Sequence, residues 1–95
     1  MNARTLTLEI VTPDGLALHE ADVEHVVLRR REPKFDMGSE IAVYPLHAPL
    51  LVRMADAPLR YRKSGRTTQV LVRGGFAEVL NDRVVVVTPR CQPAA

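Results

Sequence analysis

The chain is 95 residues long, which is enough for a single domain with a modest hydrophobic core. Hydrophobic residues make up 46% of the sequence and charged residues 25%, a balance typical of a folded globular protein and not of a disordered one. No stretch approaches the roughly eighteen consecutive apolar residues that a transmembrane helix needs, and Cys91 has no second cysteine with which to form a disulfide.

Charge is distributed unevenly along the chain, although the formal net charge is only +2. Residues 53–95 carry eight basic and three acidic side chains, a surplus that favours an acidic partner surface. A mixed, solvated surface is the plainer interpretation of the same composition, and both interpretations stay open at this point.

Short runs of valine and leucine, separated by Pro, Gly, Asn and Asp, predict strands along most of the chain. The first run alternates Leu6, Leu8 and Ile10 with polar residues, which indicates a strand with one buried face. The expected strands in chain order are residues 5–12, 16–18, 23–29, 41–43, 50–54, 59–62, 66–73, 76–80 and 83–88. Strands this short and closely spaced are typical of a sandwich or a barrel.

The segments between these strands differ in character. Residues 29–40 hold four basic and three acidic side chains together with a proline and a glycine, so we expect a charged loop. Residues 44–49 contain two prolines and predict a stiff loop. Gly74 and Gly75 lie between two predicted strands, where they indicate a bulge or a close approach of backbone inside a sheet.

We therefore predict an all-β fold, an antiparallel β-sandwich of about eight to ten short strands with no substantial helix. Residues 1–88 form the domain, and residues 89–95 are expected to be a short, mobile tail. Residues 84–87 are four consecutive valines, whereas a half-exposed antiparallel strand alternates apolar and polar residues. Both faces of that strand are therefore expected to be covered, the second either by the rest of the domain or by a partner protein.

Residues that carry catalytic or metal chemistry do not form a recognisable pattern. The three histidines, His19, His25 and His47, lack the spacing of a zinc site, and the sequence holds no nucleophile motif or phosphate-binding loop. We therefore expect no catalytic residue, no bound metal and no cofactor. His47 lies between two prolines and is interpreted as a side chain that braces its loop.

The basic stretch Arg60, Arg62, Lys63 and Arg66 is the feature that nucleic-acid binding would use. Tyr61 is the aromatic residue nearby, and strand alternation places it on the opposite face from its two arginine neighbours. Proteins that bind single strands interleave stacking aromatic residues with charges on the same face. We therefore expect a solvated hairpin and no nucleic-acid partner.

Two segments carry a resemblance to a known family. The segment YPLHAPLL, which starts at Tyr44, resembles the P-G-H-A-P-L signature of the epsilon subunits of F-type ATP synthases. The segment GGFAEV, which starts at Gly74, resembles a second signature of that family, and LEIVTP from Leu8 resembles its first strand and turn. The likeness covers residues 5–88, and the two signatures occur in the family's order.

The resemblance implies the N-terminal β-sandwich domain of an epsilon subunit, a non-catalytic central-stalk part that couples the gamma shaft to the membrane c-ring during proton- or sodium-driven ATP synthesis. It implies a peripheral position at the cytoplasmic face of a bacterial inner membrane, with a plastid thylakoid as the less favoured location. It places Glu40 at the family's c-ring contact, and we assign Arg30, Arg31, Tyr44 and His47 to the same contact. The residues that we assign to gamma contact are Phe76, Val84 and Val86.

The chain also departs from the family. Ala42 and Leu46 stand where the family usually has glycine, and residues 29–40 are several residues longer than usual. The family's sandwich is usually followed by a regulatory arm of two α-helices without counterpart in the printed sequence, so we expect a coupling piece. The open alternatives are a free-standing β-sandwich module that binds a protein or a ligand, and a small enzyme with a pocket that includes His47.

Overall fold

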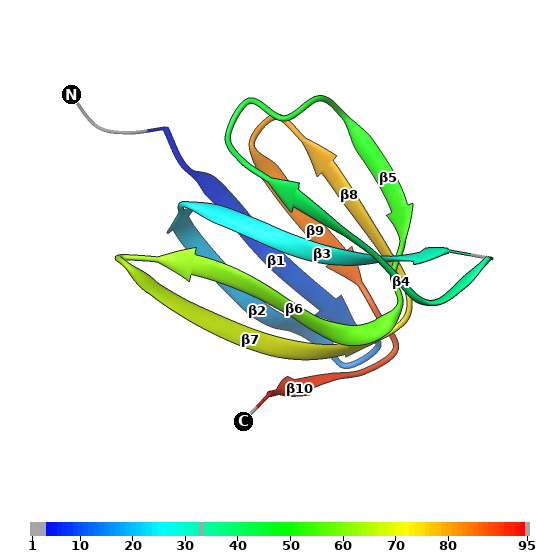
Figure 1. Cartoon of the computed structure of the whole chain (residues 1–95). Coiled ribbons are helices and arrows are strands. Elements are labelled where there is room, and N and C mark those ends of the chain that lie inside the picture. Colours follow the sequence, from blue (N-terminus) through cyan, green and yellow to red (C-terminus); the bar gives the residue numbers. More distant parts are fainter. Residues whose placement is uncertain (1–3, 33, 95) are drawn as a thin grey trace.

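The computed structural model describes residues 4–32 and 34–94, apart from the side chains of residues 35–37. The described residues form ten strands and no helix, and the strands lie in two facing sheets (Figure 1), so the predicted β-sandwich is confirmed. The strands are β1 (Leu6–Thr12), β2 (Gly15–Val23), β3 (His25–Glu32), β4 (Phe35–Val43), β5 (Leu50–Arg53), β6 (Asp56–Lys63), β7 (Arg66–Arg73), β8 (Phe76–Leu80), β9 (Arg83–Val87) and β10 (Cys91–Pro93). None of the described residues belongs to a helix long and apolar enough to cross a membrane.

Each sheet contains five strands. Sheet A has the order β2-β1-β9-β8-β5, and sheet B has the order β10-β7-β6-β3-β4. Neighbouring strands are antiparallel, with the exception of β1 and β9, which run parallel with Ile10 opposite Val86. Segments from the two ends of the chain thus lie side by side in sheet A.

The hydrophobic core lies between the two sheets and follows from strand alternation. On β1, Leu6, Leu8 and Ile10 are buried, whereas the residues between them lie on the outer face. The largest fully buried side chains are Leu6, Leu8, Ile10, Val23, Val26, Leu28, Val43, Leu59, Val72, Val79, Val84 and Val86. Burying one such side chain stabilises the fold by about 1.5–3 kcal/mol, so the core is the main source of stability.

Residues 29–40 do not form the loop that their charge predicts. β3 continues to Glu32 and β4 begins at Phe35, so the segment is an antiparallel hairpin that projects from the sandwich (Figure 1). Arg29 lies opposite Glu40, and Arg30 lies opposite Ser39. Charged residues suit these strands because the projecting part is largely solvated and because opposite charges on facing strands attract.

Two other segments extend the sheets beyond the predicted limits. β2 continues to Val23, well past the expected end at residue 18. The segment after residue 88 supplies β10, which pairs with β7 and places Cys91 opposite Val72. Residues 91–93 therefore belong to sheet B and cover the edge of β7, which is a correction to the expected mobile tail.

Gly75 brings three backbone segments close together, as the pair of glycines predicts. Its φ is +94°, and a Cβ atom built on it would lie 2.0 Å from the carbonyl oxygen of Val87. The carbonyl oxygen of Gly75 accepts a hydrogen bond of 2.8 Å from the backbone N–H of Met54. Gly75 thus connects the end of β5 to the end of β9 at a point with no space for a side chain.

Candidate functional site: docking surfaces and a basic hollow

The described residues contain no group of three or more His, Cys, Asp or Glu side chains that could hold a metal ion. His19 lies on the outer face of sheet A, with its Nδ1 3.1 Å from Glu9 Oε2. The ring of His25 packs against Tyr44 with a centroid distance of 5.0 Å and an interplanar angle of 34°. These histidines make contacts within the fold.

The outer face of sheet A carries a continuous apolar row. Strand register places Leu16 opposite Val11, Val11 opposite Val87, and Val87 opposite Phe76. Directly opposed residues lie on the same face of a sheet, so Val11, Val87 and Phe76 form one line across β1, β9 and β8. The exposed Leu16 lies at the end of this line on β2, where the register shifts between Ile10 and Val11. Leu16 is 58% exposed, Val87 53% and Phe76 50%. We call Leu16, Val11, Val87 and Phe76 the apolar row.

The residues predicted to contact gamma divide between the two faces of sheet A. Phe76 lies in the apolar row, whereas Val84 and Val86 are fully buried in the core between the sheets. The side chains of these two valines therefore face away from any protein docked on the outside. Sequence reasoning missed Val87 because a run of four valines does not indicate which two of them point inward.

Beside the apolar row, Glu9 is held by two basic side chains. His19 lies on β2 and Arg83 on β9, and both contact the Glu9 carboxylate, with Arg83 forming an ion pair. The hydrogen bond with His19, followed by that with Arg83, lowers the pKa of Glu9 from its ordinary value of 4.5. This part of the outer face is therefore polar and internally paired.

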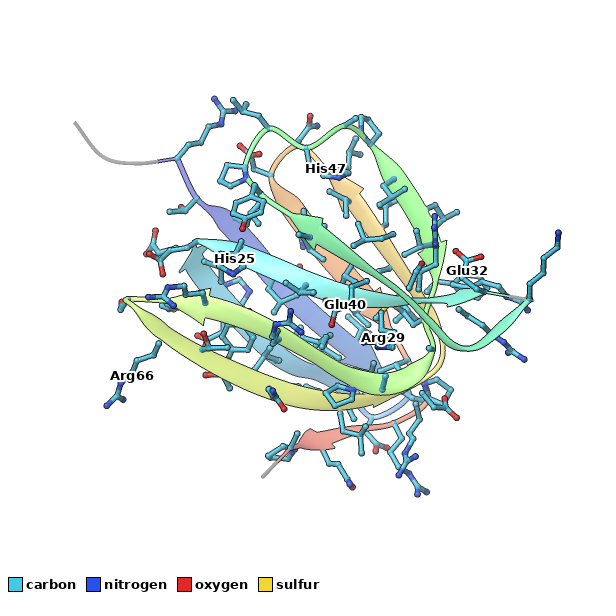
Figure 2. All side chains as sticks on the ribbon, viewed as in Figure 1. His25, Arg29, Glu32, Glu40, His47 and Arg66 are labelled. Atoms are coloured by element: carbon cyan, nitrogen blue, oxygen red, sulfur yellow. The ribbon has the colours of Figure 1, made fainter. Side chains whose placement is uncertain are left out.

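Glu40 lies between two arginines at the start of the projecting hairpin (Figure 2). Arg60 Nη1 and Nη2 donate to its two carboxylate oxygens at 3.0 and 3.2 Å, and Arg29 Nη2 donates to Oε1 at 3.1 Å. The hydrogen bonding and then the charge of Arg60, with a smaller contribution from Arg29, lower the pKa of Glu40 from 4.5. The charge of Glu40 is thus compensated within the chain.

The remaining basic residues of β6 are also paired. Arg62 Nε lies 3.5 Å from Glu24 Oε2, and Lys63 Nζ lies 3.4 Å from Glu20 Oε1. The phenol of Tyr61 donates a hydrogen bond of 3.1 Å to Glu20. The basic stretch seen in the sequence is therefore largely neutralised by neighbouring carboxylates.

Arg30 and Arg31 point to different faces of the hairpin strand. Arg30 forms an ion pair of 2.7 Å with Glu32, and its Nε donates to the hydroxyl of Ser39 at 3.3 Å. Ser39 in turn donates to Glu32 at 3.1 Å. Arg31, in contrast, is exposed and lines a hollow at the base of the hairpin.

The loop of residues 44–49 is held by Asp82 in the turn between β8 and β9. Asp82 Oδ1 accepts a hydrogen bond of 2.7 Å from the backbone N–H of Leu46, and Oδ2 accepts one of 2.5 Å from Arg4 Nε. These bonds, that from Leu46 first, lower the pKa of Asp82 from 3.8. Leu46 has a φ of +70°, the left-handed region that favours glycine, so Asp82 fixes a strained backbone.

His47 braces the same loop. Its Nδ1 lies 2.7 Å from the carbonyl oxygen of Ala48, and its backbone N–H donates to the carbonyl oxygen of Tyr44 at 3.2 Å. Tyr44 follows the last residue of β4, whereas the hairpin tip precedes the first residue of that strand. Figure 2 accordingly shows His47 well separated from Glu32.

The five residues predicted to contact the c-ring thus lie in three places. Arg30 and Arg31 lie on the outer part of β3, and Glu40 lies within β4, opposite Arg29. Tyr44 and His47 lie beyond the far end of β4. Tyr44 follows Glu40 by four positions, roughly 13 Å at the usual rise per residue, so the structure does not bring the five together in one patch.

Paired carboxylates make the stability of the fold depend on pH. Because the pKa values of Glu9, Glu40 and Asp82 are lowered by folding, the unfolded chain takes up protons first as the pH falls. Their stabilising effect is complete above the ordinary pKa values and is lost as the pH falls through the folded ones. We expect the free energy of unfolding, measured by urea denaturation, to decrease from about pH 5 to about pH 3.

The variant Asp82→Asn separates the contribution of one of these groups. Asparagine tolerates the φ of +60° found at Asp82 but does not titrate, so we expect a weaker pH dependence in this variant. An unchanged slope of unfolding free energy against pH would contradict the role assigned to Asp82.

A hollow of about 610 Å³ lies at the base of the hairpin, where β3, β5, β6 and the β7–β8 connection meet. We call it the basic hollow. Its lining residues are Arg29, Arg31, Arg53, Met54, Ala55, Asp56, Ala57, Gly74, Gly75 and Phe76. Three arginines and one carboxylate give it a positive character, and Phe76 links it to the apolar row.

The two-sheet sandwich carries an exposed apolar row on its outer face, and exposed apolar surfaces of this kind mark interaction sites. Comparison with known families assigns the domain. Residues 5–94 match the β-sandwich domain of the ATP synthase delta/epsilon chain, and the chain belongs to that family. The family resemblance of the two sequence signatures is thereby confirmed.

Curated relatives agree with this assignment. The chain is 41% identical over 91 residues to the ATP synthase epsilon chain of Nitratidesulfovibrio vulgaris, a match that covers 96% of this chain and 63% of the relative. It is 32% identical over 91 residues to the ATP synthase epsilon chain of Bacillus subtilis, covering 96% of this chain and 64% of that one. The chain thus spans less than two thirds of the length of these relatives.

Solved structures share the fold. A chain of the Euglena gracilis mitochondrial ATP synthase, from a structure of its OSCP/F1/c-ring, aligns with a TM-score of 0.81 at 24% identity, covering 94% of this chain and 53% of that chain. A chain of the Tetrahymena thermophila mitochondrial ATP synthase, from its central stalk and c-ring, aligns with a TM-score of 0.73 at 12% identity, covering 98% and 69%. At these identities the likeness is one of fold.

Proposed function

We propose that the chain is a non-catalytic central-stalk subunit of an F-type ATP synthase, which couples the gamma shaft to the membrane c-ring. The observation that carries this proposal is the apolar row on the outer face of sheet A. A rotor coupling needs one face that stays docked while torque passes through the domain. The close-packed core between the two sheets supplies the stiffness that this role requires.

Gamma docks on the apolar row in this proposal. Phe76, Val87 and Leu16 are half-exposed or more, and removing apolar surface from water contributes about 25 cal/mol per Å². Val84 and Val86 contribute indirectly, because they anchor β9 to the core and so fix the position of Val87. The proposed gamma contact therefore keeps Phe76 and adds neighbours that lie beside it in the sheet.

The c-ring contacts the projecting hairpin in this proposal. Arg30 and Arg31 lie on its outer part, and Glu40 holds its base through Arg29 and Arg60. Tyr44 and His47 lie at the other end of β4. A single partner surface therefore contacts the hairpin alone more readily than the hairpin and the 44–49 loop at the same time. The role of Tyr44 and His47 is to hold the 44–49 loop.

The proposed position is peripheral, at the cytoplasmic face of a bacterial inner membrane, with attachment through the assembled complex. The family membership and the bacterial relatives support this placement over a plastid thylakoid. The rotary complex carries out the bond chemistry, and this chain transmits force between its partners without a cofactor of its own.

The gamma contact is tested with the double variant Phe76→Asp and Val87→Asp. The two new carboxylates would lose their hydration when gamma docks on the apolar row, which is energetically costly. We therefore expect at least about a hundredfold weaker binding to purified gamma, measured by biolayer interferometry. The control is Thr67→Asp with Gln69→Asp, which adds the same charge to exposed positions on β7 of sheet B. Equal binding by both double variants would contradict the assignment of gamma to sheet A.

The ring contact is tested with Arg30→Ala, Arg31→Ala and Glu40→Ala combined. We expect less of the chain to remain in purified rotor complexes, because polar contacts of the hairpin and its internal pairing are removed together. The amount retained is measured by quantitative gel analysis after washes of increasing salt. Undiminished retention would show that the hairpin is not the ring contact.

A wild-type chain that binds neither gamma nor the assembled rotor would overturn the proposed function itself. A free-standing β-sandwich binding module would then be the better interpretation of the same fold.

A further inference from the structure

The basic hollow concentrates positive charge, and part of that charge has no acidic partner among the described side chains. Arg31 lies on the hairpin and Arg53 at the end of β5, and neither has an acidic partner among the side chains that the structure describes. Arg29 also lines the hollow, with part of its charge directed at Glu40. Asp56 is the acidic residue among the lining residues, so the hollow has a net positive charge.

The two ends of the sandwich differ in this respect. Near the β6–β7 turn, Arg62 and Lys63 pair with Glu24 and Glu20. At the end that carries the hollow, Arg73 and Arg90 lie close together through a backbone hydrogen bond of 3.0 Å, and neither forms an ion pair with a described residue. The field of these two arginines adds to that of the hollow and favours an anionic ligand at this end.

We propose that the basic hollow binds carboxylate side chains of an acidic segment belonging to a partner protein. Guanidinium groups accept carboxylates in a two-pronged geometry, and Arg31 and Arg53 approach the hollow from different strands. Phe76 belongs both to the hollow and to the apolar row. An acidic segment that leaves a subunit docked on sheet A therefore reaches the hollow directly, and in this respect the inference rests on the proposed function.

The shape and polarity of the hollow favour a carboxylate over a phosphate-bearing surface. A concave site beside a projecting hairpin admits a protruding peptide segment more easily than a flat lipid surface. Asp56 opposes a multiply charged phosphate more strongly than a singly charged carboxylate.

The test is an NMR titration of the full 95-residue chain with a hexaglutamate peptide at low salt. We expect shifts in backbone amides of residues 53–57 and 74–76, together with those of the hairpin. The double variant Arg31→Glu and Arg53→Glu should bind the peptide at least about tenfold more weakly. The single variant Arg66→Glu should bind like wild type, because Arg66 is an exposed residue at the distant β6–β7 turn (Figure 2). Thermal melts establish that each variant is folded.

Three results would overturn the inference. One is a shift pattern spread over all exposed cations, with Arg66→Glu as damaging as the double variant. Another is tighter binding of pyrophosphate than of hexaglutamate at the same site, which would indicate a phosphate site. The third is binding to anionic lipid vesicles that the double variant loses while peptide binding stays unchanged.

Gamma binding by the same variants separates this inference from the proposed function. One outcome is that wild type binds gamma and the double variant binds it equally well at every salt concentration. In that case gamma places no acidic segment in the hollow, so the inference fails while the proposed function stands. If wild type fails to bind gamma but binds hexaglutamate at the hollow, the proposed function fails while the hollow keeps its ligand class.

Discussion

Gly75→Ala is expected to destabilise the domain by about 3–5 kcal/mol, enough to unfold much of a marginally stable small protein. Two effects add at this position. The φ of +94° is unfavourable for any residue with a Cβ atom. The new methyl group would also lie 2.0 Å from the carbonyl oxygen of Val87 and 2.8 Å from the Cα atom of Thr88, so the end of β9 must move away.

Gly65→Ala is the matched control for this prediction. Gly65 has a similar positive φ of +74°, but a Cβ atom there meets nothing within 4 Å. We therefore expect a cost of only about 1 kcal/mol from backbone strain alone. Urea denaturation followed by circular dichroism measures both variants. Equal losses of unfolding free energy would mean that the close approach at Gly75 is not what requires glycine.

Val86→Asp is expected to cost about 4 kcal/mol or more, whereas Val87→Asp should leave the domain folded. Val86 has no exposed surface and packs in the core, so an aspartate there is an unpaired charge in an apolar site. Its neighbour Val87 is 53% exposed on the opposite face of the same strand, where a carboxylate stays hydrated. The unfolding free energy of each variant is measured by urea denaturation.

The same pair of variants distinguishes a residue that stabilises the fold from one that contacts gamma. Val87→Asp should keep the melting temperature close to wild type and weaken binding to gamma, because it places a charge in the apolar row. Val86→Asp should lose gamma binding only in proportion to the unfolded fraction. A folded Val86→Asp variant with normal stability would show that the inner face of β9 is not part of the core.

The charged hairpin illustrates a limit of reading strands from apolar runs. Residues 29–32 contain no apolar side chain, so the hydrophobic pattern gives no indication of a strand there. In the structure these residues pair with β4, and Ser39 of β4 bonds to both Arg30 and Glu32 of β3. Such partners become visible only when the register of the two strands is known.

The candidate site, too, is only partly predictable from the sequence. The GGFAEV segment by itself indicates a close backbone approach and places Phe76 next to it, and both are found. The apolar row requires the register of β2, β1, β9 and β8, because its members come from distant parts of the chain. The basic hollow forms only because the fold brings Arg31 and Arg53 to the same corner of the sandwich. These two residues are far apart in sequence, so the sequence does not indicate that they line one site.

The sequence by itself determined that this protein is an antiparallel-dominated β-sandwich, and its two signatures pointed to the ATP synthase delta/epsilon family. Strand alternation and turn residues are local properties, so they can be read along the chain. Only the tertiary structure decided which valines of residues 84–87 face the core and which charges are paired. Those outcomes depend on contacts between strands far apart in sequence, above all the parallel pairing of β1 with β9.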